Sequence, residues 1–153
     1  MWLRKLLSAF PCAGRGILVS LRRERNLRVH LTAVCYVCWA GALAGLEGDQ
    51  WAILCLCFGL VIGMELMNTA LEELCDRVTR QPDPFIRRAK DAAAGAVLAC
   101  ALASAAVAAW IFGPWLLSGG LWRLMRESPA FDGALALSIP AAVAWIAWQP
   151  KQA

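Results

Sequence analysis

Residues 51–76 read WAILCLCFGLVIGMELMNTALEELCD, and this stretch decides the fold class of the chain. Trp51–Leu74 supplies twenty-four mostly apolar residues, and a helix needs about 20 of these to cross a membrane. The stretch lacks the strict alternation of polar and apolar residues that is typical of a half-buried strand. It therefore predicts a membrane-spanning α-helix whose second half carries unexpected polar residues.

Three other segments are apolar enough to be compared with this one. Val29–Leu46 and Ala92–Leu117 predict two further spans, and Pro129–Trp148, which contains Pro140, is a weaker fourth candidate. The 153 residues are 60% apolar and 17% charged, against about 45–50% and 25% in soluble domains. This composition excludes a disordered chain, a coiled coil and a basic nucleic-acid-binding domain. We predict an all-α integral membrane helical bundle.

The first sixteen residues, Met1–Gly16, combine basic side chains with Leu3, Leu7 and Phe10 at helical spacing. This pattern predicts an amphipathic helix lying on the membrane surface. A frayed basic tail is the alternative. No cleavable signal peptide is evident, because Pro11 interrupts the segment and more basic residues follow it.

The basic residues are concentrated in two segments. Twelve of the fifteen lie either within the first thirty residues or between Arg77 and Lys90, whereas Glu47–Gln50 contains none. By the positive-inside rule, the N-terminus and the Arg77–Lys90 loop face the cytoplasm. A fourth span would leave Arg123 and Arg126 outside, against that rule, so Pro129–Trp148 could also be a surface helix.

The polar residues of the second predicted span fall on one stripe of the helix. Glu65, Asn68, Glu72 and Asp76 are spaced at i, i+3, i+7 and i+11, which places them on the same face. An unpaired carboxylate in hydrocarbon is costly, so the stripe predicts a polar cleft near the cytoplasmic interface. The alternative for Glu72, Glu73 and Asp76 is an ordinary interfacial position beside Arg77 or Arg80. Glu73 lies off the stripe and is left out of the site.

Other charged residues border this predicted cleft. Glu24 is the lone acid of the Arg-rich segment before the first span, and Lys90-Asp91 opens the third. Acids surrounded by bases suit a divalent cation that carries polyphosphate. Attraction of the bases to anionic lipid headgroups is the alternative.

Several common site motifs are absent from the sequence. It contains neither a P-loop nor a dinucleotide-binding glycine fingerprint. The seven cysteines lie mostly in apolar segments, and His30, the single histidine, completes no zinc site. We interpret the cysteines as packing residues.

Four ordered blocks carry a family resemblance. The run Glu65-Leu-Met-Asn68-Thr-Ala-Leu-Glu72-x-x-x-Asp76 precedes Arg88-Ala-Lys90-Asp91-x-Ala-Ala-Gly95, and Phe10-x-x-Ala-x-Arg15-Gly-Ile and Glu24-Arg-Asn26-x-Arg28-Val-His30-Leu come before both. Over about residues 10–112 the chain resembles the small prokaryotic diacylglycerol kinase / undecaprenol kinase family. We therefore expect a lipid kinase domain at residues 1–117 and an extension at residues 118–153.

The resemblance implies a homotrimer in the bacterial inner membrane, with its nucleotide site on the cytoplasmic face. It implies transfer of the γ-phosphoryl group of ATP, with Mg²⁺, to the hydroxyl of undecaprenol or diacylglycerol, with no role for nucleic acid. Glu65 would be the general base, and Glu24 and Glu72 would hold Mg²⁺. The implied nucleotide contacts are Lys5, Glu24, Asn68, Glu72, Lys90 and Asp91, and the implied substrate contacts are Arg15, Asn26, Arg28 and Glu65.

Two places depart from the family pattern, Cys12 and Gln81–Asp83, and no nucleotide contact is assigned there. The block around Asn26 resembles the undecaprenol branch more closely. The alternative function is a small proton or ion carrier that uses Glu65 and Glu72 as a relay. A carrier predicts carboxylates on several spans at mid-membrane, and the first and third spans have none there. A membrane scaffold leaves the polar stripe unexplained.

Overall fold

The computed structural model describes residues 2–148, with side chains from residue 7 onward. This part of the chain consists of helices and contains no strand, as predicted. The helices are α1 (Trp2–Arg23), α2 (Arg25–Ala44), α3 (Gly48–Val78), α4 (Pro84–Leu117), α5 (Gly120–Glu127) and α6 (Pro129–Ala147).

The two longest helices begin at caps that the sequence encodes locally. The Glu47 side chain and the Gln50 side chain form a reciprocal capping box at the start of α3. At the start of α4, the Asp83 carboxylate accepts from the backbone N–H groups of Phe85 and Ile86, at 2.7 and 3.1 Å. Pro84 follows as the first helical residue, where a missing N–H removes no helical hydrogen bond.

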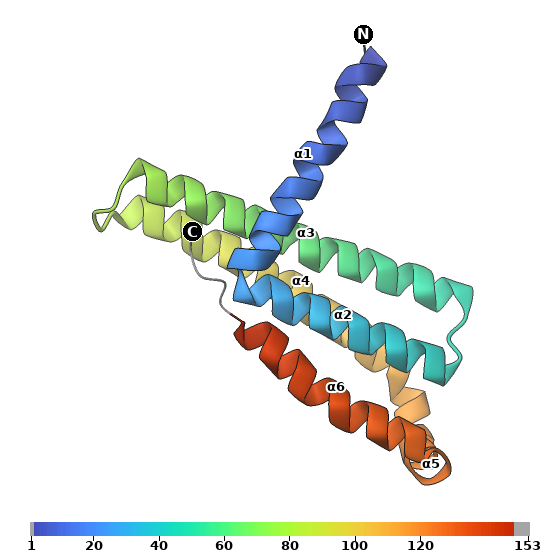
Figure 1. The fold of residues 1–153 in the computed structure, drawn as a ribbon. Helices are drawn as coiled ribbons and strands as arrows, with labels where there is room; N and C mark the ends of the chain where they lie inside the picture. The colour runs from blue at the N-terminus through green and yellow to red at the C-terminus, as the bar shows by residue number, and fades with distance from the viewer. Residues whose placement is uncertain (1, 149–153) are drawn as a thin grey trace.

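The helices α3 and α4 form an antiparallel hairpin, against which α2 packs (Figure 1). A small core of Leu54, Ile111 and Phe112 joins these helices away from the polar stripe. Many large apolar side chains are exposed, among them Leu56 and Leu102. Four helices, α2, α3, α4 and α6, are long and apolar enough to cross a membrane. These observations fit a multi-pass membrane protein, with lipid or other protein against the exposed apolar faces.

The N-terminal helix α1 is longer than predicted and projects away from the bundle (Figure 1). It passes through Pro11 and ends at Arg23 rather than near Gly16. A proline inside a helix removes one backbone hydrogen bond but does not end this one. Exposed Phe10 and Leu18 belong to an apolar stripe, which agrees with an amphipathic helix that needs a membrane or protein partner.

The helices α3 and α4 exceed the thickness of a bilayer. Their 31 and 34 residues correspond to about 46 and 51 Å at 1.5 Å per residue, whereas the hydrocarbon core is about 30 Å thick. Counted from Gly48, Glu65 lies about 26 Å along α3, and Glu72 and Asp76 lie about 36 and 42 Å along it. These last two distances exceed the thickness of the hydrocarbon core.

Candidate active site

The polar stripe of α3 is partly buried inside the bundle. Glu65 is 3% exposed and Asn68 is 8% exposed. Asn68 Nδ2 donates a hydrogen bond to Glu72 Oε1 at 2.9 Å. Thr69 Oγ1 donates to the Glu65 backbone carbonyl at 3.0 Å, so its hydroxyl is satisfied within the helix. The hydrogen bonds within α3 therefore fix the side chains of the stripe, whose carboxylate and amide oxygens can act as acceptors.

One of these oxygens has no partner in the described part of the chain. Asn68 Oδ1 is buried and accepts no hydrogen bond there. A buried polar atom left unsatisfied costs free energy, and such an atom in a native structure needs an explanation. An amide oxygen beside the Glu72 carboxylate can accept from a metal-bound water or from a ligand.

The junction between α1 and α2 brings further polar groups to this stripe. Asn26 is close enough to hydrogen-bond the Glu65 side chain, and His30 interacts with it electrostatically. Burial raises the pKa of the Glu24 carboxyl above its usual value, and nearby Glu72, Glu65 and Glu73 raise it further, while Arg28 opposes them. Like charges gathered this closely favour either protonation or a bound cation.

A second helix adds a cation at the Asp76 end of the stripe. The Lys90 ammonium of α4 donates to the Asp76 carboxylate of α3 and forms an ion pair with it. Asp91, in contrast, pairs with Arg87 one turn earlier at 3.8 Å, and both side chains are exposed. Lys90 thus joins the stripe, whereas Asp91 lies on the outer face of α4 in this single chain.

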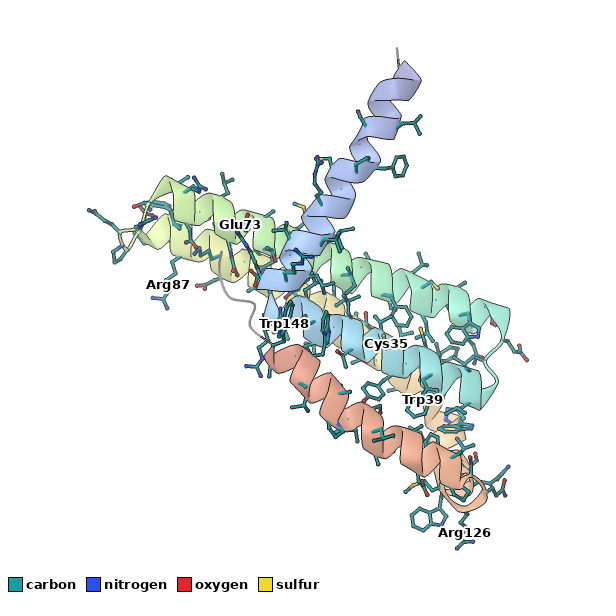
Figure 2. All side chains as sticks on the ribbon, viewed as in Figure 1. Cys35, Trp39, Glu73, Arg87, Arg126 and Trp148 are labelled. Carbon is teal, nitrogen blue, oxygen red and sulfur yellow. The ribbon has the colours of Figure 1, made fainter. Side chains whose placement is uncertain are left out.

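A groove lies beside the stripe, between the end of α1 and the adjacent face of α3. Its volume is about 780 Å³, and it is lined by Arg23, Ala70, Glu73, Leu74, Asp76, Arg77 and Arg80. Arg23 Nη1 and Glu73 Oε1 form an exposed ion pair at 3.2 Å. Figure 2 shows Glu73 on α3 near the base of α1. The guanidinium groups of this groove are suited to an anionic ligand.

The donor set fits a hydrated magnesium ion. Within the described residues, no group of three or more His, Cys, Asp or Glu side chains converges as a closed metal site. Mg²⁺ rarely needs such a cage, because it keeps several waters and takes one or two carboxylates together with substrate phosphates. Glu24, Glu72 and the unpartnered Asn68 Oδ1 provide hard oxygen donors of this kind.

The structure brings some of the predicted site residues together and separates others. Those that gather around the stripe are Glu24, Asn26, Glu65, Asn68, Glu72, Asp76 and Lys90. Arg15 is exposed on α1, away from the stripe, and the Lys5 side chain lies outside the described residues. Arg28 is buried at the α1–α2 junction, where two backbone carbonyls accept from its Nη1 and its Nε has no partner within the described residues. The functional roles of all these residues stay predictions.

Two neighbours of the site were not selected from the sequence. In the sequence, His30 completes no zinc site and lies in a family block without an assigned role. Its electrostatic interaction with Glu65 follows from its position one turn after Asn26 on α2. That spacing is visible in the sequence and was the available signal. Arg23 is one of several basic residues near the end of α1. Its ion pair with Glu73, fifty positions away, is not indicated by any local sequence pattern.

The comparisons with known proteins identify the family. Residues 11–112 match the model of the prokaryotic diacylglycerol kinases. The chain belongs to this family. It is 40% identical over 114 residues to the undecaprenol kinase of Bacillus subtilis, which covers 74% of this chain and 93% of that protein. It is 39% identical over 114 residues to the diacylglycerol kinase of Synechocystis sp., which covers 74% of this chain and 65% of that protein.

Membership of the prokaryotic diacylglycerol kinase family makes the chain an enzyme of the lipid kinase type. The match includes α2, α3 and most of α4, and it ends before α5. No solved structure matches the chain.

Proposed function

We propose that the protein transfers the γ-phosphoryl group of ATP to the hydroxyl of a membrane lipid. The observation that carries this proposal is the placement of Glu65, which is buried in the long apolar helix α3 and lies close to Glu24 and Glu72. A lipid alcohol approaches such a group from the apolar side, and polyphosphate approaches it from the charged side. Family membership supports the same chemistry.

In the proposed reaction, Glu65 accepts the proton of the lipid hydroxyl. The hydroxyl oxygen forms a bond to the γ-phosphorus, the bond from that phosphorus to the β,γ-bridging oxygen breaks, and ADP leaves. Asn26 orients the Glu65 carboxylate through its side chain, and Lys90 provides positive charge for the nucleotide. Phosphoryl transfer depends mainly on positioning and charge stabilisation, which these residues provide.

Glu24 and Glu72 are the proposed magnesium ligands, with Asn68 beside them. When bound there, Mg²⁺ would neutralise negative charge on the ATP phosphates. Asn68 Nδ2 fixes the Glu72 carboxylate by its 2.9 Å hydrogen bond. Its free Oδ1 can accept from a water on the metal. The cluster of acids is then stabilised by the ligand rather than by protein partners.

We place the site on the cytoplasmic side of the inner membrane and the chain in a homotrimer. Support for the orientation comes from the twelve basic residues at the Glu24 end of the bundle. Support for oligomerisation comes from the exposed apolar faces and from the small-residue stretch Ala92–Ala106 of α4, because small residues let membrane helices pack closely. Lys5, Arg15 and Asp91 are then proposed to meet the nucleotide or lipid in the assembled protein.

The test is phosphorylation of defined lipids by the purified protein. Undecaprenol and diacylglycerol are each supplied in detergent micelles with radiolabelled ATP and Mg²⁺, and products are separated by thin-layer chromatography. We expect undecaprenyl phosphate to form faster than phosphatidic acid. Equal rates remove the preference for the polyprenol, and no labelled lipid from either acceptor contradicts the proposed function.

A matched pair of variants then tests the base. Glu65→Gln keeps the size of the side chain and removes its charge, so labelled product should fall by at least about 100-fold, with nucleotide binding retained. Glu127→Gln on α5 makes the same chemical change at the opposite end of the bundle and should leave the rate unchanged. Unchanged phosphorylation by Glu65→Gln would remove Glu65 as the general base.

A further inference from the structure

The C-terminal helix α6 lies beside α2 and touches it at points near both ends and the middle of α6, although no residue of α6 is fully buried. Three contacts define the register: Trp39 with Phe131, whose ring centroids are 5.4 Å apart, Tyr36 Oη with Ser138 Oγ at 3.0 Å, and Arg28 Nη2 with the Ile146 carbonyl at 3.4 Å. As residue numbers fall along α2, they rise along α6. The two helices are therefore antiparallel, which returns the end of α6 to the level of the candidate site.

The contact with Ile146 is made by Arg28, an arginine that is almost completely buried. Arg28 is 2% exposed, and its Nη1 donates to the carbonyls of Leu21 and Arg22, at 3.0 and 3.1 Å. Those carbonyls belong to the last turn of α1, and the carbonyl of Ile146 belongs to the last turn of α6. The last carbonyls of a helix lack intrahelical partners and carry partial negative charge. One buried guanidinium therefore stabilises the ends of two helices at once.

The turn that Arg28 holds is the one that carries Glu24. The Glu24 backbone N–H donates to the Ser20 carbonyl of α1 at 2.7 Å, and Glu24 follows Arg22 by two positions. A change at the end of α1 therefore moves Glu24 relative to Glu65 and Glu72. Figure 2 shows Trp148, next to the end of α6, at this same end of the bundle, with Arg126 at the other.

We propose that helix α6 is a positioning element of the kinase site: α6 holds Arg28, and Arg28 holds the α1–α2 junction that carries Glu24. This inference rests on the proposed function. The extension lies outside the family match, which ends at residue 112. In this chain, helix α6 thus contributes a backbone carbonyl and a docking face rather than a group that touches substrate.

The first test compares two truncations of the full chain. The shorter truncation, lacking residues 149–153, keeps Ile146 and serves as the control. The longer truncation, lacking residues 145–153, removes the Ile146 carbonyl. Hydrogen exchange is followed by mass spectrometry on peptides that cover residues 20–25, without nucleotide. We expect exchange at the Glu24 amide to be faster by about tenfold in the longer truncation. Equal exchange in the two proteins would overturn the inference.

The second test is a double-mutant cycle on kcat/KM. Arg28→Lys is introduced into both truncations, because lysine cannot reproduce the several directed donors of a guanidinium. If α6 acts through Arg28, the longer truncation lowers kcat/KM by about tenfold and raises the Mg²⁺ concentration needed for half-maximal rate. Arg28→Lys should then cost less in that background than in the control. Additive losses would contradict the proposed pathway and leave α6 with a structural role only.

A full-length variant covers the case in which the truncated protein fails to fold. Phe131→Ala with Ser138→Ala removes both side-chain contacts that set the register and keeps every backbone carbonyl. It should increase exchange over residues 20–25 in the same direction as the truncation. If the unmodified chain phosphorylates no lipid, the proposed function fails, and the exchange comparison alone decides whether α6 holds the junction.

Discussion

Asn68 and Glu72 are joined on α3 by a 2.9 Å hydrogen bond from Nδ2 to Oε1, and the Asn68 Oδ1 atom is left without a partner among the described residues. One amide thus serves two purposes, since its donor fixes a carboxylate and its acceptor stays available. Because a carboxylate has several acceptor sites, Glu72 can hold this bond and still coordinate a cation.

Replacing Asn68 by leucine tests that arrangement. Asn68→Leu keeps a similar shape and removes both the donor to Glu72 and the free oxygen. Hydrogen bonds to charged groups are worth about 1.5–3 kcal/mol, so kcat/KM should fall by about 10- to 100-fold, with a higher Mg²⁺ requirement. Initial rates measured across a series of Mg²⁺ concentrations check this. An unchanged Mg²⁺ dependence would show that Asn68 does not support the metal site.

Adjacent residues on α3 allow a matched comparison. Glu72→Gln removes a proposed metal ligand and should lower activity by about 100-fold or more. Glu73→Gln makes the same change about 100° around the helix, where the carboxylate pairs with Arg23 on the surface. Exposed pairs contribute about 0–1 kcal/mol, so its loss should stay below about fivefold. Similar losses in the two variants would argue against the assigned face.

Lys90 should affect nucleotide binding more than stability. Its ion pair with Asp76 is solvent-accessible, so Lys90→Met should change stability by no more than about 1 kcal/mol while raising the KM for ATP by about tenfold. Asp76→Asn breaks the same pair but keeps the cation, and it should raise this KM less. Steady-state kinetics and thermal unfolding of both variants decide. If Asp76→Asn has the larger effect on KM, the ion pair matters more than the ammonium.

The Glu24 carboxyl makes the metal-free protein sensitive to pH. Burial, helped by Glu72, raises its pKa in the folded state, so the folded protein binds this proton more tightly than the unfolded chain. The resulting stabilisation is fully present below the unfolded pKa of Glu24 and is lost as pH rises through the raised folded pKa. We expect thermal stability without Mg²⁺ to fall across that window. Glu24→Gln should flatten the fall, and equal slopes in both proteins would contradict the assignment.

The apolar helices and the polar stripe could be predicted from the sequence, because both depend on the spacing of residues within one short segment. Apolar runs of sufficient length predicted α2, α3, α4 and α6, and the i, i+3, i+7 spacing placed Glu65, Asn68 and Glu72 on one face. The end of α1 was harder to predict. The helix continues through Pro11 to Arg23, and the carbonyls of its last turn accept hydrogen bonds from the Arg28 side chain of α2.

The contacts of Arg28 could not be predicted from residue spacing. In the sequence it is one of seven basic residues in the first thirty, and nothing local distinguishes it from its exposed neighbours. Its guanidinium also reaches α6, which begins a hundred positions later and supplies the Ile146 carbonyl. A contact between segments this far apart is fixed by tertiary packing, which residue periodicity does not encode.

The antiparallel pairing of α6 with α2 bears on membrane topology. If all four long apolar helices cross the membrane, the chain returns to the side from which it started, and Trp148 emerges on the same face as Glu24. A compartment-sensitive reporter joined after Trp148 would then give the signal of the cytoplasm, whereas one joined after Leu117, behind three crossings, would give the opposite signal. In that arrangement, both ends of the bundle are accessible to the same pool of soluble partners.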